Sequence, residues 1–351
     1  MSRETSSLPA WQARRPAGQV GIRLMAWLCR CFGWRFGAAL LWPITLAFVL
    51  RDGAGRRASR RYLSRALGRP PGFGEIFRHF HTFAHTLLDR FFLHASRAAA
   101  PFDIRVEGLE HLAEAVAAGK GVILLGAHLG SFEALRFATG AGAPVAIRMV
   151  MHRGRRGALT ALFEENDPSF AASVIALPAS GGDGIALALA LRETLAGGGV
   201  VGLLADRVAA GQAVMTADFL GAPAPFPLGP FRLAAATGAP VLLGFGLRLA
   251  RRRYLVHIEP FVDAIPPCRA GDAAGERPAE PWAALRPHVT RYAERLSHFC
   301  REYPYNWFNF HDVWENDDES GRSRRPPRPA ARASLAGAGG DAAADHRGAD
   351  G

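Results

Sequence analysis

The sequence predicts an α/β fold in which helices flank a mostly parallel central sheet, preceded by a helical region that associates with a membrane. From about Phe102 onward, apolar runs of strand length alternate with alanine-rich helical stretches, which is typical of a parallel sheet covered on both faces. Before that point, a long apolar segment lies beside many arginines. We therefore divide the chain into a basic helical region (1–100), an α/β domain (101–315) and a tail (316–351).

Seven apolar runs are the candidate strands, and helical stretches such as 185–195 and 230–236 lie between them. In chain order the runs are FDIRVEG, GVILLGA, APVAIRMVM, SVIALPA, GGVVGLLAD, APVLLGFGLRL and RYLVHIEPFVD. No internal repeat is apparent. After Asn316 the apolar periodicity is lost, and the composition is that of a disordered segment.

The apolar N-terminal segment, residues 21–50, reads GIRLMAWLCRCFGWRFGAALLWPITLAFVL. Its uncharged part, residues 36–50, is shorter than the roughly 20 apolar residues that a spanning helix needs, and it contains Pro43. Insertion into the membrane interface fits better, with arginines among the headgroups and tryptophans at the boundary. The first 20 residues are polar and hold two prolines, so no cleavable signal peptide is evident.

Positive charge is concentrated in residues 1–100, although the whole chain has a formal net charge of only +11. Such a region attracts anionic surfaces, and we expect anionic membrane lipids on the cytoplasmic side of the bilayer. Seven arginines directly follow the apolar segment: Arg51, Arg56, Arg57, Arg60, Arg61, Arg65 and Arg69. A buried helical hairpin with a solvated basic face is the alternative, and a GC-rich genome could explain the arginine excess. We expect no nucleic-acid partner, because the arginines are not interleaved with aromatic residues on a strand pattern.

Metal binding is not expected. His81 and His85 have metal-ligand spacing on a helix, but no acidic residue or cysteine accompanies them nearby. The four cysteines form no metal-binding pattern and are expected to be reduced.

The candidate catalytic residues lie in GVILLGAHLGSFEALR, where a strand turns into a helix. His128 follows the strand, and ligands of open α/β sheets collect at the carboxyl ends of strands. Glu133, five positions later, could accept a hydrogen bond from the imidazole, fix its tautomer and raise its basicity. GAHLGS has a histidine where an α/β hydrolase has its nucleophilic serine. A histidine–glutamate pair without a nucleophile suits direct attack by a hydroxyl group of an acceptor on an activated acyl group.

These residues resemble a known family. GAHLGSFEALR is similar to the first block of the lysophospholipid acyltransferase superfamily, and most similar to the branch that holds the late acyltransferases of lipid A biosynthesis. LLADRV, the Gly-Pro helix region FLGAPAPFPLGPFRLAAATGAPVLLGFGLR and the C-terminal YPYNWFNFHDVW resemble further blocks of that branch. The N-terminal and C-terminal blocks together are most similar to predicted acyltransferases encoded with bacterial aryl-polyene and fatty-acid assembly genes. The resemblance covers about residues 9–315.

The resemblance implies that His128 is the general base and Glu133 its orienting partner. It also implies that Asp206 and Arg207 line the acceptor or donor pocket, although a local ion pair at a strand end is the alternative. Where the lipid A enzymes carry a Tyr-Arg-Pro-type block, this chain has AIRMVMHRGRRG. Its candidates for phosphate or oxyanion contact are Arg148 and His152.

Acyl transfer from a thioester needs no metal and no redox cofactor. The implied donor is an acyl carrier protein or coenzyme A, and the acidic carrier protein could also use the arginine-rich surface. The implied acceptor is a lipid or glycolipid, and the implied location is the cytoplasmic face of the bacterial inner membrane. Two alternatives remain: a non-catalytic membrane-bound lipid-binding or scaffold protein, and a thioesterase.

Overall fold

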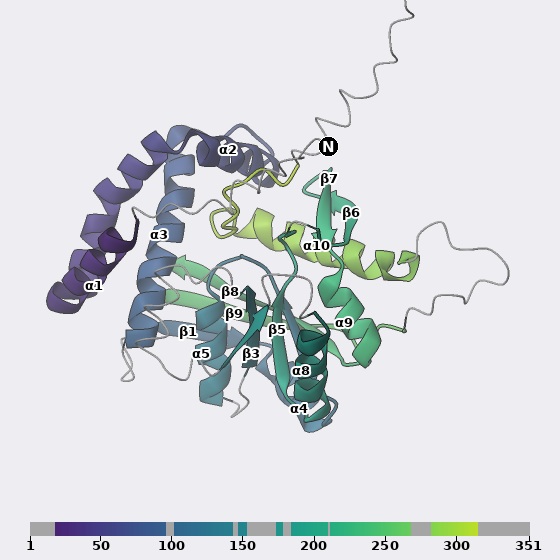
Figure 1. Cartoon of the computed structure of the whole chain (residues 1–351). Helices are drawn as coiled ribbons and strands as arrows, with labels where there is room; N and C mark the ends of the chain where they lie inside the picture. Colours follow the sequence, from purple (N-terminus) through teal and green to yellow (C-terminus); the bar gives the residue numbers. More distant parts are fainter. Residues whose placement is uncertain are drawn as a thin grey trace, which may run out of the picture. The chain divides into compact units, whose positions relative to one another are not determined.

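The computed structural model describes residues 18–95, 102–142, 147–152, 173–177, 184–209, 211–267 and 282–314. Figure 1 shows a sheet surrounded by helices, with the N-terminal helices alongside it. The predicted disordered tail lies outside the described residues. The predicted boundary near residue 100 stays a prediction.

The central sheet confirms the predicted fold class. Its strand order is β1-β9-β8-β2-β5-β3-β4, and every neighbouring pair is parallel except the antiparallel pair β8–β9. Each of the seven strands coincides with one of the predicted apolar runs, and β3 and β8 extend one residue beyond theirs, to His152 and Ala250. Their bounds are β1 Asp103–Glu107, β2 Val122–Gly126, β3 Ile147–His152, β4 Val174–Leu177, β5 Val200–Leu204, β8 Val241–Ala250 and β9 Arg253–Val262.

Helices cover both faces of the sheet, and for this reason the central strands are apolar without alternation. In β2, Val122 and Leu124 join one buried cluster, whereas Ile123 and Leu125 join the other. Successive side chains of a strand point to opposite faces, so both faces must be covered by protein. The first cluster includes residues of α4 (Leu109–Ala117) and α5 (Phe132–Gly142). The second includes residues of α8 (Gly184–Ala196), α9 (Gly229–Thr237) and α10 (Arg286–Glu302).

A separate hairpin, β6 (Val214–Phe219) with β7 (Ala222–Pro227), was not expected from the sequence. β7 has the sequence APAPFP, and proline disfavours strands because it lacks the backbone N–H. In a sheet of two strands, each strand has an outer edge where no N–H is needed. The prolines are therefore compatible with β7.

The first helix, α1 (Gly18–Arg51), reverses direction at Gly33, whose φ of 77° is not helical. A Cβ atom on Gly37 would lie 2.7 Å from the sulfur of Cys29. In a straight helix, residues eight apart are separated by about 12 Å. α1 therefore consists of two arms, residues 18–32 and 34–51, folded against each other.

The second arm of α1 packs along α3 (Phe73–Ala95), as Figure 1 shows. The ring of Trp42 lies 4.7 Å from that of Phe77, measured between ring centroids. Most of the large exposed apolar side chains in the described part of the chain lie on α1, and we call them the α1 apolar face: Leu24, Trp27, Phe32, Phe36, Trp42, Ile44, Phe48 and Leu50. By length and composition alone, 21–51 is the one described segment apolar enough to cross a membrane. Because of the reversal, however, each arm is shorter than the roughly 20 residues that a crossing requires.

Four of the seven arginines predicted to contact lipid make contacts within the protein. Arg56 donates to the carbonyl oxygens of the last turn of α1, and Arg61 pairs with Asp312 at 2.6 Å. Arg65 lies over the ring of Trp314, and Arg69 pairs with Glu75. The other three arginines, Arg51, Arg57 and Arg60, are exposed and lie at the end of α1 and on α2 (Gly53–Leu67).

Candidate active site

The register of the two central strands brings His128 and Asp206 together. Gly126, the last residue of β2, is paired with Leu204, the last residue of the parallel strand β5. The pairing extends past the strands, because Ala205 N donates to Gly126 O at 3.1 Å. His128 and Asp206 each lie two residues beyond their strand. Nδ1 of His128 is accordingly 2.8 Å from Oδ1 of Asp206.

The carboxylate of Asp206 is buried and fully engaged. Oδ2 accepts hydrogen bonds from the backbone N of His128 at 2.9 Å, from Nε1 of Trp307 at 2.9 Å and from Nδ2 of Asn309 at 3.2 Å. Burial alone would raise the pKa of Asp206. The charge of His128 and its hydrogen bonds, together with Arg207, outweigh burial and lower that pKa to about 2.

The ionisation of Asp206 fixes the tautomer of His128. A carboxylate only accepts hydrogen bonds, so Nδ1 of His128 must donate, and in the neutral imidazole the unprotonated nitrogen is Nε2. The His128 side chain is 30% exposed, whereas that of Asp206 is completely buried. The pair therefore presents an imidazole at the carboxyl edge of the sheet, with its carboxylate behind it.

The C-terminal segment 303–314 packs directly on the loop that carries His128, residues 127–131, which we call the catalytic loop. Phe308 N donates to His128 O, and Gly130 N donates to Asn306 O, both at 2.8 Å. The sequence expectation placed Arg207 in the substrate pocket. The structure shows it donating to Phe308 O at 2.7 Å and to Oδ1 of Asn309. It thereby holds the segment that supplies two donors to Asp206.

His79 of α3 holds the same C-terminal segment from the other side. Nε2 of His79 donates to the carbonyl oxygen of Trp307 at 2.8 Å, and Nδ1 lies 2.9 Å from Oγ of Ser59 on α2. Burial lowers the pKa of His79 to about 4, so its imidazole is neutral at physiological pH. Nδ1 then accepts from the serine hydroxyl. The helical N-terminal region and the site are thus linked by hydrogen bonds.

Gly130 allows the catalytic loop to lie against β8. Its φ is 73°, and a Cβ at this position would overlap the carbonyl oxygen of Gly246. Ser131 N donates to the same carbonyl oxygen at 2.7 Å, and Oγ of Ser131 accepts from Ala134 N in the first turn of α5. Ser131 is the hydroxyl-bearing residue of this loop. It is buried in this capping role and is not placed as a nucleophile.

Glu133 is not the carboxylate bonded to Nδ1 of His128. It lies in the first turn of α5 and is buried, and its Oε1 is 2.5 Å from Nη2 of Arg90 on α3. Burial lowers the pKa of Arg90, and the charge of Glu133 opposes that effect. The expected hydrogen-bonding position behind the imidazole is occupied by Asp206. The role of Glu133 in catalysis stays a prediction.

Arg148 and His152 lie at different levels of β3. Arg148 is exposed and is paired with Val201, five residues before Asp206 on β5, which corresponds to about 16 Å along the strand. The structure therefore places Arg148 far from the carboxyl edge. His152 ends β3, and by the register it is level with the end of β5. The side chain of His152 lies outside the described part of the chain.

No group of three or more potential metal ligands occurs among the described residues. Nδ1 of His81 instead lies 3.2 Å from Oγ1 of Thr45, and the ring of His81 stacks on that of Phe77. His85 packs beside Trp34. The spacing of the two histidines reflects packing between α1 and α3.

Four side chains that support the site were not singled out from the sequence. They are Trp307, Asn309, Arg90 and His79. Trp307 and Asn309 lie in the C-terminal block that carries the family resemblance, but the sequence gives no sign that they contact Asp206. The equal offset of His128 and Asp206 from their strand ends is a signal for their pairing. It can be used only once β2 and β5 are known to be neighbours.

The family model described as "Bacterial lipid A biosynthesis acyltransferase" matches residues 74–315, more than half of the chain. The chain is also similar to the phosphatidylinositol mannoside acyltransferase of Mycobacterium tuberculosis (strain ATCC 25618 / H37Rv). The two are 28% identical over 300 residues, which cover 79% of this chain and 83% of the relative. The matched region contains the His128–Asp206 pair and the C-terminal segment that packs on it. The chain belongs to the bacterial lipid A biosynthesis acyltransferase family.

Proposed function

We propose that the protein transfers an acyl chain from an acyl carrier protein or coenzyme A thioester to a hydroxyl group of a lipid or glycolipid, with His128 as general base. The observation that carries the proposal is the His128–Asp206 pair at the carboxyl edge of the sheet. The acyl chain is a fatty acyl chain, or a polyene acyl chain as implied by the resemblance to acyltransferases of aryl-polyene assembly.

The reaction uses the two nitrogens of His128 differently. Nε2 takes the proton of the acceptor hydroxyl as its oxygen attacks the thioester carbonyl, and the buried carboxylate of Asp206 stabilises the imidazolium that forms. When the tetrahedral intermediate collapses, the carbon–sulfur bond breaks, and the imidazolium returns the proton to the leaving thiolate. The products are an ester and a free thiol, and the base is regenerated.

A glycolipid acceptor is supported by the name of the mycobacterial relative, a phosphatidylinositol mannoside acyltransferase. Attachment to the cytoplasmic face of the inner membrane is supported by the α1 apolar face and by the exposed arginines at the end of α1 and on α2. Since α1 reverses at Gly33, we propose that both arms enter one leaflet and do not cross the bilayer.

A transfer assay with the purified full-length chain tests the proposed reaction. His128→Ala should lower the transfer rate by about 10²–10⁴-fold, because general-base catalysis is lost. The matched control is His298→Ala, which removes an exposed histidine of α10 that pairs with Glu302. Products are followed by mass spectrometry with acyl-carrier-protein and acyl-CoA donors and with extracted lipids as acceptors.

Three other outcomes would overturn the proposal. Near-normal transfer by His128→Ala would remove the assigned base. Release of free fatty acid at the same rate with and without an acceptor would indicate a thioesterase. Lipid binding without any turnover would indicate a scaffold protein. Comparing the lipids of a deletion strain with those of its complemented parent would then identify the acceptor.

A further inference from the structure

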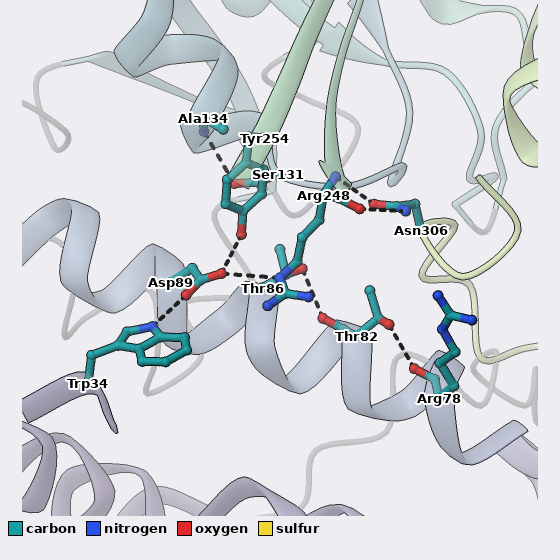
Figure 2. Close-up of polar contacts among 10 residues, drawn as sticks. All are labelled: Trp34, Arg78, Thr82, Thr86, Asp89, Ser131, Ala134, Arg248, Tyr254 and Asn306. Carbon is teal, nitrogen blue, oxygen red and sulfur yellow. Dashed lines mark hydrogen bonds and ion pairs between the residues drawn. The ribbon is translucent and has the colours of Figure 1, made fainter. Parts of the chain in front are cut away.

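A buried carboxylate on α3, Asp89, joins the membrane-facing helix to the sheet (Figure 2). Oδ1 of Asp89 accepts a hydrogen bond from Nε1 of Trp34 on α1 at 2.6 Å. Oδ2 accepts from the hydroxyl of Tyr254 on β9 at 2.8 Å and from Nε of Arg248 on β8 at 3.2 Å. Asp89 is fully buried, and donors on both of its oxygens compensate for the loss of water.

The connection continues from Arg248 to the catalytic loop. The backbone of Arg248 makes two hydrogen bonds with the side chain of Asn306, N to Oδ1 at 2.8 Å and Nδ2 to O at 3.2 Å (Figure 2). The carbonyl oxygen of Asn306 accepts from Gly130 N, two residues after His128. The next residue, Trp307, donates to Asp206. Hydrogen bonds, together with short stretches of backbone, therefore link Trp34 to both members of the catalytic pair.

Two features mark the ends of this connection, a close backbone contact at the site and the reversal of α1 at the other end. Gly130 lies so close to Gly246 that no Cβ would fit, so the loop follows β8 closely. At the other end, Trp34 is the residue directly after the reversal at Gly33, so a displacement of the first arm of α1 would act on it directly. Packed interiors respond to such displacements by switching arrangement rather than by bending gradually.

We infer that Asp89 is a positioning residue that couples the lipid contact of α1 to the geometry of the catalytic loop. When a lipid surface holds the two arms of α1, the hydrogen bond from Trp34 keeps the carboxylate of Asp89 in position. Asp89 in turn positions the side chain of Arg248. The backbone of Arg248 positions Asn306, which binds the catalytic loop. The transfer rate then rises in the presence of a membrane. This inference rests on the proposed acyl transfer and on the proposed attachment through the α1 apolar face.

A purely stabilising function would not require this arrangement. A buried ion pair is often no more stabilising than well-packed apolar side chains. The polar cluster instead makes directional contacts, because Oδ1 of Asp89 is bonded to α1 and Oδ2 is bonded to β8 and β9. Trp34 lies on the route from α1 to the loop, whereas Tyr254 lies on β9 and off that route.

The difference between these two donors gives the test. Trp34→Phe and Tyr254→Phe each remove one hydrogen-bond donor to Asp89 and leave an aromatic ring in place. The rate of transfer to a short-chain, water-soluble hydroxyl acceptor is measured with and without vesicles of anionic phospholipid. We expect vesicles to raise the wild-type rate at least about fivefold, the lower end of typical coupling between sites.

Tyr254→Phe should keep the wild-type ratio of rates with and without vesicles. Trp34→Phe should lower that ratio by about fivefold, the size expected for one hydrogen bond. The loss should lie in kcat, while KM for the thioester stays unchanged. Because Trp34 is buried, the α1 apolar face remains, and vesicle flotation should show unchanged binding.

A second pair of variants keeps the inference testable if Trp34→Phe unfolds. Asp89→Asn should also lose the response to vesicles. Asp103→Asn should keep it, because Asp103 pairs with Nε of Arg253 at the same 3.2 Å but on the surface. Equal ratios in all variants, or equal losses in Trp34→Phe and Tyr254→Phe, would overturn the inference. A wild-type rate that ignores vesicles would overturn it too, with the proposed function intact. Only a wild type without transfer activity would contradict the proposed function itself.

Discussion

Two buried carboxylates near the catalytic loop have different partners, although both were candidates from the sequence. Asp206 is bonded to Nδ1 of His128, and Glu133 is paired with Arg90. The sequence singled out His128, Glu133 and Asp206, and its local motif predicted Glu133 for the position behind Nδ1 that Asp206 occupies in the structure. The actual pairing depends on the register between β2 and β5, which are separated by more than 70 residues. A local spacing carries no information about that register.

Substituting each carboxylate by its amide should separate the two roles. Asp206→Asn removes the charge that stabilises the imidazolium. Because three donors would hold the amide oxygen in the place of Oδ2, its NH2 group would face Nδ1 and favour the wrong tautomer, so kcat should fall by about 10²–10⁴-fold. Glu133→Gln leaves the partly buried Arg90 without its ion pair to Glu133, so the free energy of unfolding should fall, by at most about 3–5 kcal/mol. The kcat of folded Glu133→Gln should change far less. Transfer kinetics and thermal unfolding of both variants check this.

The pH dependence provides a control for the same prediction. The pKa of Asp206 is lowered to about 2, so the stabilisation from its ionised form is present above its ordinary pKa and is lost only as the pH falls toward 2. A fall of kcat on the acid side that begins well above pH 2 should therefore not come from protonation of Asp206. If Glu133→Gln lost as much kcat as Asp206→Asn at unchanged stability, Glu133 would be the catalytic partner that the motif indicated.

Among the secondary-structure elements, the regular strands were predictable and the exceptions have physical causes. Seven strands of the sheet coincide with apolar runs, because strands covered on both faces must be apolar throughout. The β6–β7 hairpin was missed because three prolines in β7 contradict ordinary strand preferences. The reversal of α1 was missed because Gly33 is only one of several glycines in an apolar segment. Its positive φ cannot be recognised from composition.

The α1 apolar face should control membrane attachment. Replacing Trp27, Trp42 and Phe48 together by serine should weaken binding to anionic vesicles at least about 100-fold, since each buried aromatic side chain contributes roughly 1.5–3 kcal/mol. Vesicle sedimentation measures this. The control replaces Val214 and Leu249, which are also apolar and exposed but lie outside α1, and should bind normally. Full recovery of the wild type in the soluble fraction after low-salt lysis would contradict attachment.

Across the whole molecule, the sequence gives the amount of positive charge in the N-terminal region but does not show which arginines are bound within the protein. Seven arginines after the apolar segment suggested a lipid-binding cluster, yet four of them bind partners within the protein. Two of these partners, Asp312 and Trp314, belong to the C-terminal segment, about 250 residues away. Pairings over such distances follow from the packed fold and not from local sequence. The basic region therefore serves both the fold and, by our proposal, the membrane.

The C-terminal segment should be essential, and the tail after it dispensable. A chain ending at Glu302 loses Trp307 and Asn309, two donors to Asp206, and should lose transfer activity and much of its stability. A chain without residues 317–351 should keep both its location and its activity. Activity and thermal unfolding of the two truncated chains check this. A fully active chain ending at Glu302 would mean that the segment does not support the pair.

The position of these donors in the sequence has a consequence for the order of events during synthesis. Trp307 lies 101 residues after Asp206, its hydrogen-bonding partner. At roughly 5–20 residues per second, the ribosome needs about 5–20 s more to add it. By the start of that interval α1 has already been synthesised and can contact the bilayer. The catalytic pair still lacks the hydrogen bonds from Trp307 and Asn309 to Asp206. The nascent chain would thus reach the membrane before it can consume thioesters.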